Sequence, residues 1–303
     1  MESYQLIPSE FISQGTRCRG DLYLPQGIVQ PPVVLMAHGF AAERSFRLPA
    51  YAAEFTRQGL AVFLFDYRCF GDSDGTPRHL VDPQRHIQDW QAAIAHVRTL
   101  PQVNGRSIAL WGTSFSGGHV LVAAARDQQI KAVVAQAPFI DSISTMRKLG
   151  LRYLLQSTPH ALRDIWRMIT GQKPHMVKVV APPDEFAVMN TPESYPGYTA
   201  LIPDGSTWRN ECPARILLTF ALYRPQQQAA RINCPVLLMI GEEDSLISET
   251  AVEKTSRRIP QAELVTYPFG HFDIYLGEPF ADAVDRQASF LKQHLYAFAY
   301  SFA

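Results

Sequence analysis

The chain of 303 residues is poor in charge and lacks any long apolar run. Charged residues make up 18% of it, and 28 Lys and Arg balance 28 Asp and Glu. Without net charge, the chain has no overall field to attract nucleic acid or an anionic membrane surface. No stretch approaches the ~18 uncharged apolar residues of a membrane span. We therefore expect no nucleic acid and no membrane among its partners.

Cysteine is scarce as well. No C-x-x-C pair occurs among Cys18, Cys69, Cys212 and Cys234, a pattern typical of free thiols in a reducing cytoplasm. The N-terminus has no basic segment followed by an apolar run, so no secretory signal is predicted. We expect a cytoplasmic protein.

Signals for cofactors are missing too. No G-x-G-x-x-G or phosphate loop follows the first strand-like runs, and the spacing in the aspartate-rich run 66–75 fails the EF-hand pattern. We interpret that run as a structural loop and expect no cofactor and no metal.

Apolar residues, in contrast, reach 47%, which is enough to build a large core. Short apolar runs alternate with segments of helical character, a pattern that favours an α/β fold with a doubly wound, mostly parallel sheet. Two alternating segments at the start, 4–13 and 17–24, predict an antiparallel hairpin at one edge of the sheet. The predicted strands are 33–37, 61–65, 107–111, 131–136, 236–240 and 263–267, and the predicted helices are 48–58, 82–100, 115–127, 248–258 and 280–296.

The alternation breaks between residues 141 and 231. An excursion of this length is too long for an ordinary loop. We interpret it as a largely helical cap, or lid, inserted into a core formed by residues 1–140 and 232–303. Open α/β sheets bind ligands at the carboxyl ends of their strands, where we expect the cap to lie. Its aromatic residues suggest an apolar pocket: Trp166, Phe186, Tyr195, Tyr198 and Trp208.

The most specific motif is Gly112-Thr113-Ser114-Phe115-Ser116, between a predicted strand and a predicted helix. A sharp turn in this context is typical of a nucleophile elbow, G-x-S-x-G. Ser116 replaces the second glycine but is still small. We predict that Ser114 is a nucleophile.

A serine nucleophile needs a base, and the base needs an acid. His271 directly follows the last predicted strand, which places it at the same sheet edge as Ser114. Asp244 follows the strand before that and is our choice for the acid. Three competitors remain for the acid: Glu242, Glu243 and Asp141.

The oxyanion of an acyl intermediate needs backbone N–H donors. We predict the N–H of Phe115, the residue after the nucleophile, and the N–H of Phe40 in His38-Gly39-Phe40, which follows the strand 33–37. Ala41 is the alternative to Phe40.

Taken in order, His38-Gly39-Phe40, the loop 66–75, the Ser114 elbow, Asp244 and His271 resemble the α/β-hydrolase superfamily. The inserted segment resembles that of the bacterial serine-aminopeptidase-like or dienelactone-hydrolase-like branch. The resemblance covers nearly the whole chain. It implies an eight-stranded sheet with an antiparallel second strand and an acyl-enzyme mechanism, but no particular substrate.

The predicted function is a serine hydrolase that cleaves a small-molecule carboxylic ester or thioester. The alternatives are a peptidase or amidase, and an acyltransferase or carbon–carbon hydrolase, each using the same three residues. A non-catalytic binding protein is a further alternative. The uncharged, aromatic tail 295–303 can pack on its own core or on a second copy of the chain, so a homodimer is an alternative to a monomer.

Overall fold

A computed structural model describes residues 4–296. Eight strands form one sheet in the spatial order β1-β2-β4-β3-β5-β6-β9-β10. Only β2 runs against the others, so the expected eight-stranded sheet with an antiparallel second strand is confirmed. The strands are β1 (Tyr4–Ser13), β2 (Thr16–Pro25), β3 (Pro32–Ala37), β4 (Ala61–Phe65), β5 (Asn104–Thr113), β6 (Ala132–Gln136), β9 (Val236–Gly241) and β10 (Ala262–Tyr267).

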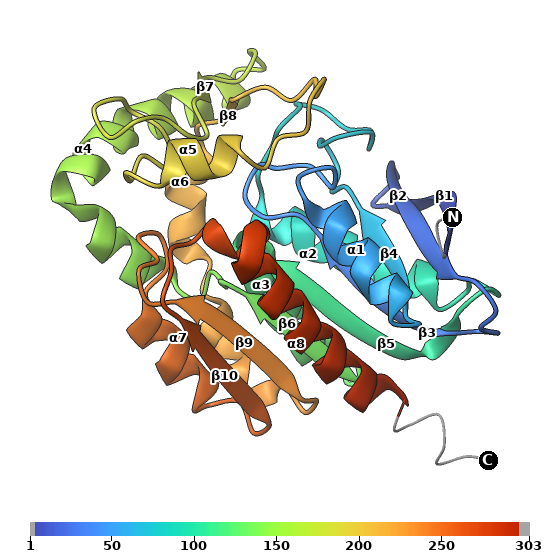
Figure 1. Ribbon diagram of the computed structural model, residues 1–303. Coiled ribbons are helices and arrows are strands. Elements are labelled where there is room, and N and C mark those ends of the chain that lie inside the picture. Colours follow the sequence, from blue (N-terminus) through green and yellow to red (C-terminus); the bar gives the residue numbers. More distant parts are fainter. Residues whose placement is uncertain (1–3, 297–303) are drawn as a thin grey trace.

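Helices cover the sheet on both faces (Figure 1). α1 (Leu48–Arg57) packs beside α8 (Gly277–Tyr296), and α2 (Pro83–Val97) packs beside α3 (Phe115–Arg126). α7 (Glu249–Ser256) connects β9 to β10. The predicted β-α alternation is therefore confirmed. The tail from residue 297 onward, on which the homodimer alternative rests, lies outside the described residues.

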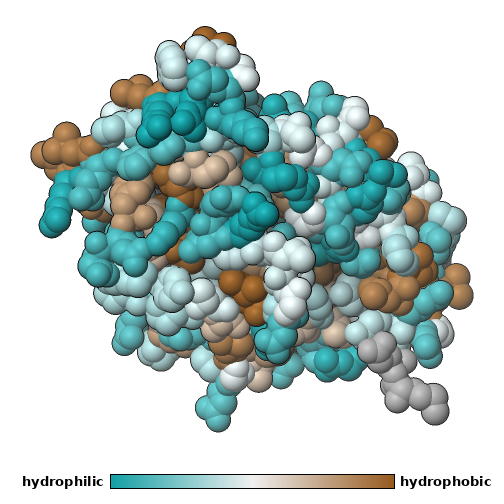
Figure 2. Space-filling model, turned by 90° about the horizontal axis from the view of Figure 1, so that it is seen from above, coloured by the Kyte–Doolittle hydropathy of each residue, from teal (hydrophilic) through white to brown (hydrophobic). Residues whose placement is uncertain are grey.

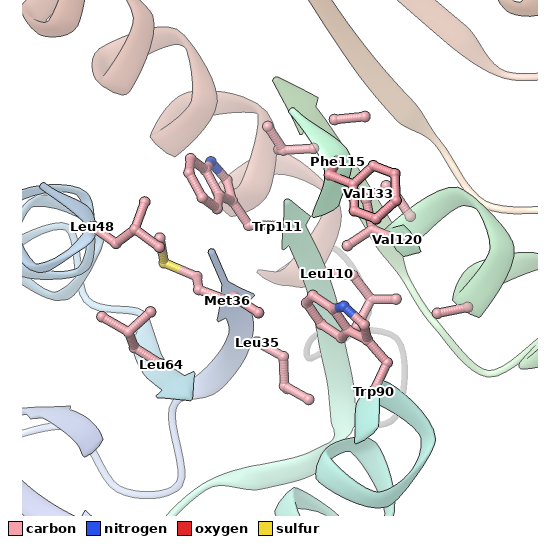
Figure 3. Packing of buried hydrophobic residues seen from close by; sticks show 14 of the residues in the cluster. Leu35, Met36, Leu48, Leu64, Trp90, Leu110, Trp111, Phe115, Val120 and Val133 are labelled. Atoms are coloured by element: carbon pink, nitrogen blue, oxygen red, sulfur yellow. The ribbon is translucent and has the colours of Figure 1, made fainter. Parts of the chain in front are cut away.

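The central strands are buried on both faces, which explains why their sequences are apolar without alternation. β3 and β5 pair in parallel register, with Leu35 opposite Leu110 and Met36 opposite Trp111. Figure 3 shows Met36 and Trp111 near Leu48 of α1, and Leu35 and Leu110 near Trp90 of α2. Successive side chains of one strand therefore fill two different layers of the core.

The chain leaves the sheet after β6 and returns at β9. Within this excursion, residues 141–231 are called the insertion below. They form the green to yellow layer at the top of Figure 1. Long irregular stretches separate its helices. Its elements are α4 (Ser142–Ile169), β7 (Met176–Val177), α5 (Ser194–Thr199), β8 (Cys212–Pro213), α6 (Ile216–Thr219) and the 3₁₀ turns η1 (Phe220–Leu222) and η2 (Pro225–Arg231); a last such turn, η3 (Asp273–Tyr275), precedes α8.

α4 is not a continuous helix. Gly150 has φ 78° and ψ 168°, far from helical values, and divides it into a short first part and a longer second part. Glycine tolerates a positive φ because it has no Cβ. Asp141 caps the first part by accepting a hydrogen bond from the N–H of Ser144.

Candidate active site

Ser114 lies at a strained turn between β5 and α3. Its φ of 54° and ψ of −119° fall in a region that non-glycine residues rarely adopt. The turn is held on both sides, since Ser114 N–H donates to the Gln136 carbonyl and the Phe139 N–H donates to the Ser114 carbonyl. A Cβ at Gly112 would lie 2.3 Å from the Ser116 carbonyl oxygen, so this position requires glycine. The strain and tight packing together present the Ser114 side chain above the sheet.

Ser116, which replaces the usual second glycine, has a partner of its own. Its buried Oγ lies 2.8 Å from the hydroxyl of Tyr67, which in turn accepts a hydrogen bond from Trp90 Nε1. The extra hydroxyl therefore completes a buried hydrogen-bond network.

The structure brings Ser114, His271 and Asp244 together at the carboxyl edge of the sheet. His271 Nε2 lies 3.0 Å from Ser114 Oγ, and His271 Nδ1 lies 2.6 Å from Asp244 Oδ2. Asp244 is fixed in turn, since its Oδ1 accepts the backbone N–H groups of Leu246 and Ile247. The His271 and Asp244 side chains are only 2% and 1% exposed, so solvent screens this ion pair little.

The competing acids are placed elsewhere. Glu242 and Glu243 are exposed. Asp141 is engaged as the cap of α4 and pairs with Arg224 Nε at 2.7 Å. Among the described residues, only Asp244 has a carboxylate oxygen within hydrogen-bond distance of the His271 imidazole ring.

The electrostatic surroundings of His271 favour its protonated form. Burial by itself lowers the pKa, but the charge and hydrogen bond of Asp244 and the charge of Glu193 outweigh it. Lys148 opposes them weakly, and the net effect is a pKa above the ordinary 6.5. His271 therefore gains proton affinity from its carboxylate neighbours, as suits a group that accepts a proton and returns it.

Other histidines near Ser114 have different partners. His119 Nδ1 lies 2.6 Å from the Tyr223 hydroxyl and its Nε2 lies 3.2 Å from His86. Burial lowers the pKa of His119 to about 3 and that of His38 to about 4. Both therefore stay neutral at physiological pH.

The predicted oxyanion donors lie beside the serine. Gly39 is so close that a Cβ on it would lie 3.2 Å from Ser114 Cβ, and the rings of Phe40 and Phe115 meet edge to face at 5.4 Å. Among residues 4–296, neither the Phe40 N–H nor the Phe115 N–H donates to another group. The N–H of the alternative donor, Ala41, likewise donates to no other described group, so it stays an alternative to Phe40.

Two small cavities lie beside Ser114, which lines both of them. One of about 110 Å³ lies between the core residues Phe40, Phe115 and Phe139 and the insertion, and its lining is mostly apolar. Another of about 30 Å³ lies on the side of His271, near Phe46, Tyr198 and Tyr275. Figure 2, which looks onto the insertion, shows hydrophobic side chains recessed between hydrophilic ones. The insertion side of the larger cavity includes Leu149, Tyr153, Met189, Ile216, Leu217 and Phe220.

These linings correct one expectation about the aromatic residues of the insertion. Trp166 and Tyr195 are 57% and 43% exposed and face away from the site, and Phe186 stacks on His160 and Tyr153. Tyr198 alone of the five lines a cavity beside Ser114. Other residues of the insertion supply the apolar surface instead, both aliphatic ones such as Leu149 and Ile216 and the aromatic Tyr153 and Phe220.

Side chains of the insertion also form hydrogen bonds to the loops that carry the candidate site. The sequence analysis did not predict these contacts. The Tyr198 hydroxyl donates to the Phe40 carbonyl at 2.9 Å, and Trp208 Nε1 donates to the Ala41 carbonyl at 2.8 Å. Lys148 Nζ donates to the carbonyls of Asp244 and Ile247, both at 2.6 Å. No local motif marks such contacts, because their partners lie far apart in the sequence.

The described part of the chain holds no group of three or more His, Cys, Asp or Glu side chains that could bind a metal ion. The four cysteines are unpaired and buried, and burial raises their pKa values, for example that of Cys234 to about 11. Among residues 4–296, no helix combines the length and apolar character that crossing a membrane requires.

Fold and sequence comparisons define the class of protein. The chain shares its fold with the α/β hydrolase GrgF from Penicillium sp. sh18, at a TM-score of 0.81 and 24% identity over 96% of this chain and 99% of the other. This likeness shows that the chain has the α/β-hydrolase fold, as the resemblance implied. Residues 30–276 match the model of the serine aminopeptidase S33 family, so the chain belongs to that family. It is therefore an enzyme of the α/β-hydrolase class.

Two relatives cover nearly the whole chain. The quorum-quenching protein AidA of Acinetobacter baumannii is 40% identical over 94% of this chain and 93% of its own length. The polyketide transferase af380 of Aspergillus fumigatus is 27% identical over 93% of this chain and 95% of its own. The relatives thus include one protein named for quorum quenching and one named for polyketide transfer.

Proposed function

We propose that this protein is a serine hydrolase that cleaves a carboxylic ester or thioester through a covalent acyl-enzyme. One observation carries the proposal: hydrogen bonds run unbroken from Asp244 to His271 at 2.6 Å and from His271 to Ser114 at 3.0 Å, beside an apolar cavity. A nucleophile, a base and an orienting acid in this order form a catalytic triad.

The proposed reaction has two halves. Ser114 Oγ attacks the acyl carbon while His271 Nε2 takes its proton, and the N–H groups of Phe40 and Phe115 form the oxyanion hole. Collapse of the intermediate breaks the bond to the alcohol or thiol, which leaves with the proton from His271. Water then attacks the acyl-enzyme by the same route and releases the acid. Asp244 holds the imidazole tautomer in both halves.

We propose the insertion as a cap that selects the acyl group. Its aliphatic side chains close the larger cavity over Ser114 and Phe115, which favours an apolar acyl chain there. The smaller cavity beside His271 then faces the leaving group.

Similarity to the two relatives extends the proposal in two directions. Hydrolysis of an ester within a cell-density signal would quench that signal, so the kinship with a quorum-quenching protein supports acyl signalling molecules as substrates. Kinship with a polyketide transferase supports acyl transfer, in which an acceptor other than water attacks the acyl-enzyme. A peptidase or amidase would use the same residues, and a non-catalytic binding protein would have no need of an intact triad.

The test begins with a fluorophosphonate probe, which reacts with activated serines. We expect wild type and S256A, which alters a serine on α7, to be labelled and S114A to stay unlabelled. Equal labelling of S114A and wild type would overturn the proposal. Rates on p-nitrophenyl acetate, butyrate, octanoate and dodecanoate, on matching thioesters and on aminoacyl-arylamides then separate esterase from peptidase.

A single substitution tests the acyl cavity. L149W places a larger side chain in the lining of α4, so kcat/KM should fall for octanoate and dodecanoate but hardly for acetate. L162W, which alters an exposed residue of the same helix, is the control. An unchanged chain-length profile in L149W would place the acyl group elsewhere.

We also propose a cytoplasmic location. Four unpaired, buried cysteines support a reducing compartment.

A further inference from the structure

Glu193, in the insertion, lies between the two loops that carry Asp244 and His271. Its Oε1 accepts the backbone N–H of Ser245, the residue after Asp244, at 2.7 Å. Its Oε2 accepts the backbone N–H of His271 itself, at 2.8 Å. One carboxylate therefore joins the acid loop to the base loop, with one oxygen for each.

The surroundings of Glu193 are shaped to receive this carboxylate. A Cβ at Gly270 would lie 2.4 Å from Glu193 Oε2, so any residue larger than glycine there would collide with it. On the other side, the Ser245 hydroxyl lies within hydrogen-bond distance of Glu193 and of Thr191 Oγ1. Thr191 Oγ1 also lies 2.7 Å from Ser194 Oγ, which ties this contact to the start of α5.

We infer that Glu193 is a positioning residue that sets the distance between the acid and the base of the proposed triad. The inference rests on the proposed function and adds a residue of the insertion to the machinery. Backbone N–H groups bound to a carboxylate make short, strong hydrogen bonds, so the two loops are held at a fixed separation. Without Glu193, the partly buried N–H groups of Ser245 and His271 would lose their acceptor, which is energetically costly.

Glu193 acts on His271 through charge as well as through geometry. The charged groups that act on His271 are Asp244, from the loop after β9, and Glu193 and Lys148 from the insertion. Asp273, two residues after His271 on its own loop, accepts the N–H of Gly270. The negative charge of Glu193 helps to raise the pKa of His271, and Lys148 acts in the opposite sense. Removing the charge at Glu193 should therefore let His271 stay neutral to lower pH.

The experiment compares E193Q with wild type and with E211Q. Glu211 is a carboxylate of the same insertion that pairs with exposed Arg209, so E211Q is the matched control. In E193Q, the acid limb of the pH profile of kcat/KM should move to lower pH, because one of the negative charges that raise the pKa of His271 is gone. Its kcat should fall by about tenfold to a hundredfold, the cost of misplacing catalytic groups by an ångström. E211Q should match wild type in both.

A second variant separates charge from geometry. E193D keeps the negative charge but is one methylene shorter, so it cannot reach both loops. Its acid limb should stay near that of wild type while its kcat falls as in E193Q. A purely structural role would lower the melting temperature but leave the pH profile of folded E193Q unchanged, and that result would overturn the inference.

Two outcomes keep the inference separate from the proposed function. If E193Q fails to fold, an E193D variant that folds with wild-type kcat would overturn the inference by itself. If S114A retains activity and labelling, the proposed function fails instead, whatever the Glu193 variants do.

Discussion

Replacing Asp244 by Asn tests the proposed triad most directly, because the change keeps the size of the side chain. In wild type, Asp244 Oδ1 accepts two backbone N–H groups while Oδ2 accepts from His271 Nδ1. In D244N, the amide oxygen can keep the two backbone bonds only if the amide NH₂ faces His271 Nδ1. Because the amide NH₂ is a donor, His271 Nδ1 must then act as the acceptor. The imidazole proton therefore moves from Nδ1 to Nε2.

A proton on Nε2 points at Ser114 Oγ, so the imidazole can no longer take the serine proton. The wrong tautomer costs about 10⁴-fold in kcat, or ~5.5 kcal/mol of barrier. The opposite amide orientation would set its NH₂ against the N–H groups of Leu246 and Ile247, which is also unfavourable. The first orientation removes the base, and the second keeps it only by giving up both backbone hydrogen bonds.

Initial rates on p-nitrophenyl butyrate, with active-site titration of the folded enzyme, measure this loss. D141N is the matched control, since Asp141 caps α4 and pairs with Arg224 away from His271, and it should keep most of the activity. A kcat of D244N within about tenfold of wild type would refute the assignment, since the wrong tautomer costs far more.

Three further predictions follow from the same contacts. The raised pKa of His271 means that kcat/KM should decline with falling pH from a midpoint above 6.5, because protonated imidazole cannot act as base; a midpoint at or below 6.5 would contradict this. G112A should lower the free energy of unfolding by about 1–3 kcal/mol in urea, because its Cβ would meet the Ser116 carbonyl at 2.3 Å. R68M should lower the free energy of unfolding, measured in urea, by ~3–5 kcal/mol, because it leaves the fully buried Asp89 without the guanidinium that lies 2.5 Å away. Adding D89N should recover part of that stability.

The sequence predicts the core well because its signals are local. Apolar runs such as 61–65 and 236–240 coincide with β4 and β9 nearly to the residue, since strands buried on both faces cannot alternate. Ser114 directly follows β5, and Asp244 and His271 lie in the loops just after β9 and β10, so parallel pairing gathers all three at one edge of the sheet.

The insertion is harder to predict because its contacts are distant. Glu193 meets residues 52 and 78 positions further along the chain, and nothing near it in sequence marks it. Trp166 is a candidate pocket residue by its type alone, yet it is 57% exposed on α4. Such facts follow from packing, which no short pattern encodes.

The hydrogen bonds between the insertion and the loops around Ser114 limit how this enzyme family can diversify. Tyr198, Trp208, Lys148 and Glu193 bind backbone groups at Phe40, Ala41, Asp244 and His271, while their neighbours line the cavities. Exchanging this insertion for that of a relative would therefore alter turnover along with selectivity. A chimaera can inherit a new substrate range intact only if it carries these four anchoring side chains with it.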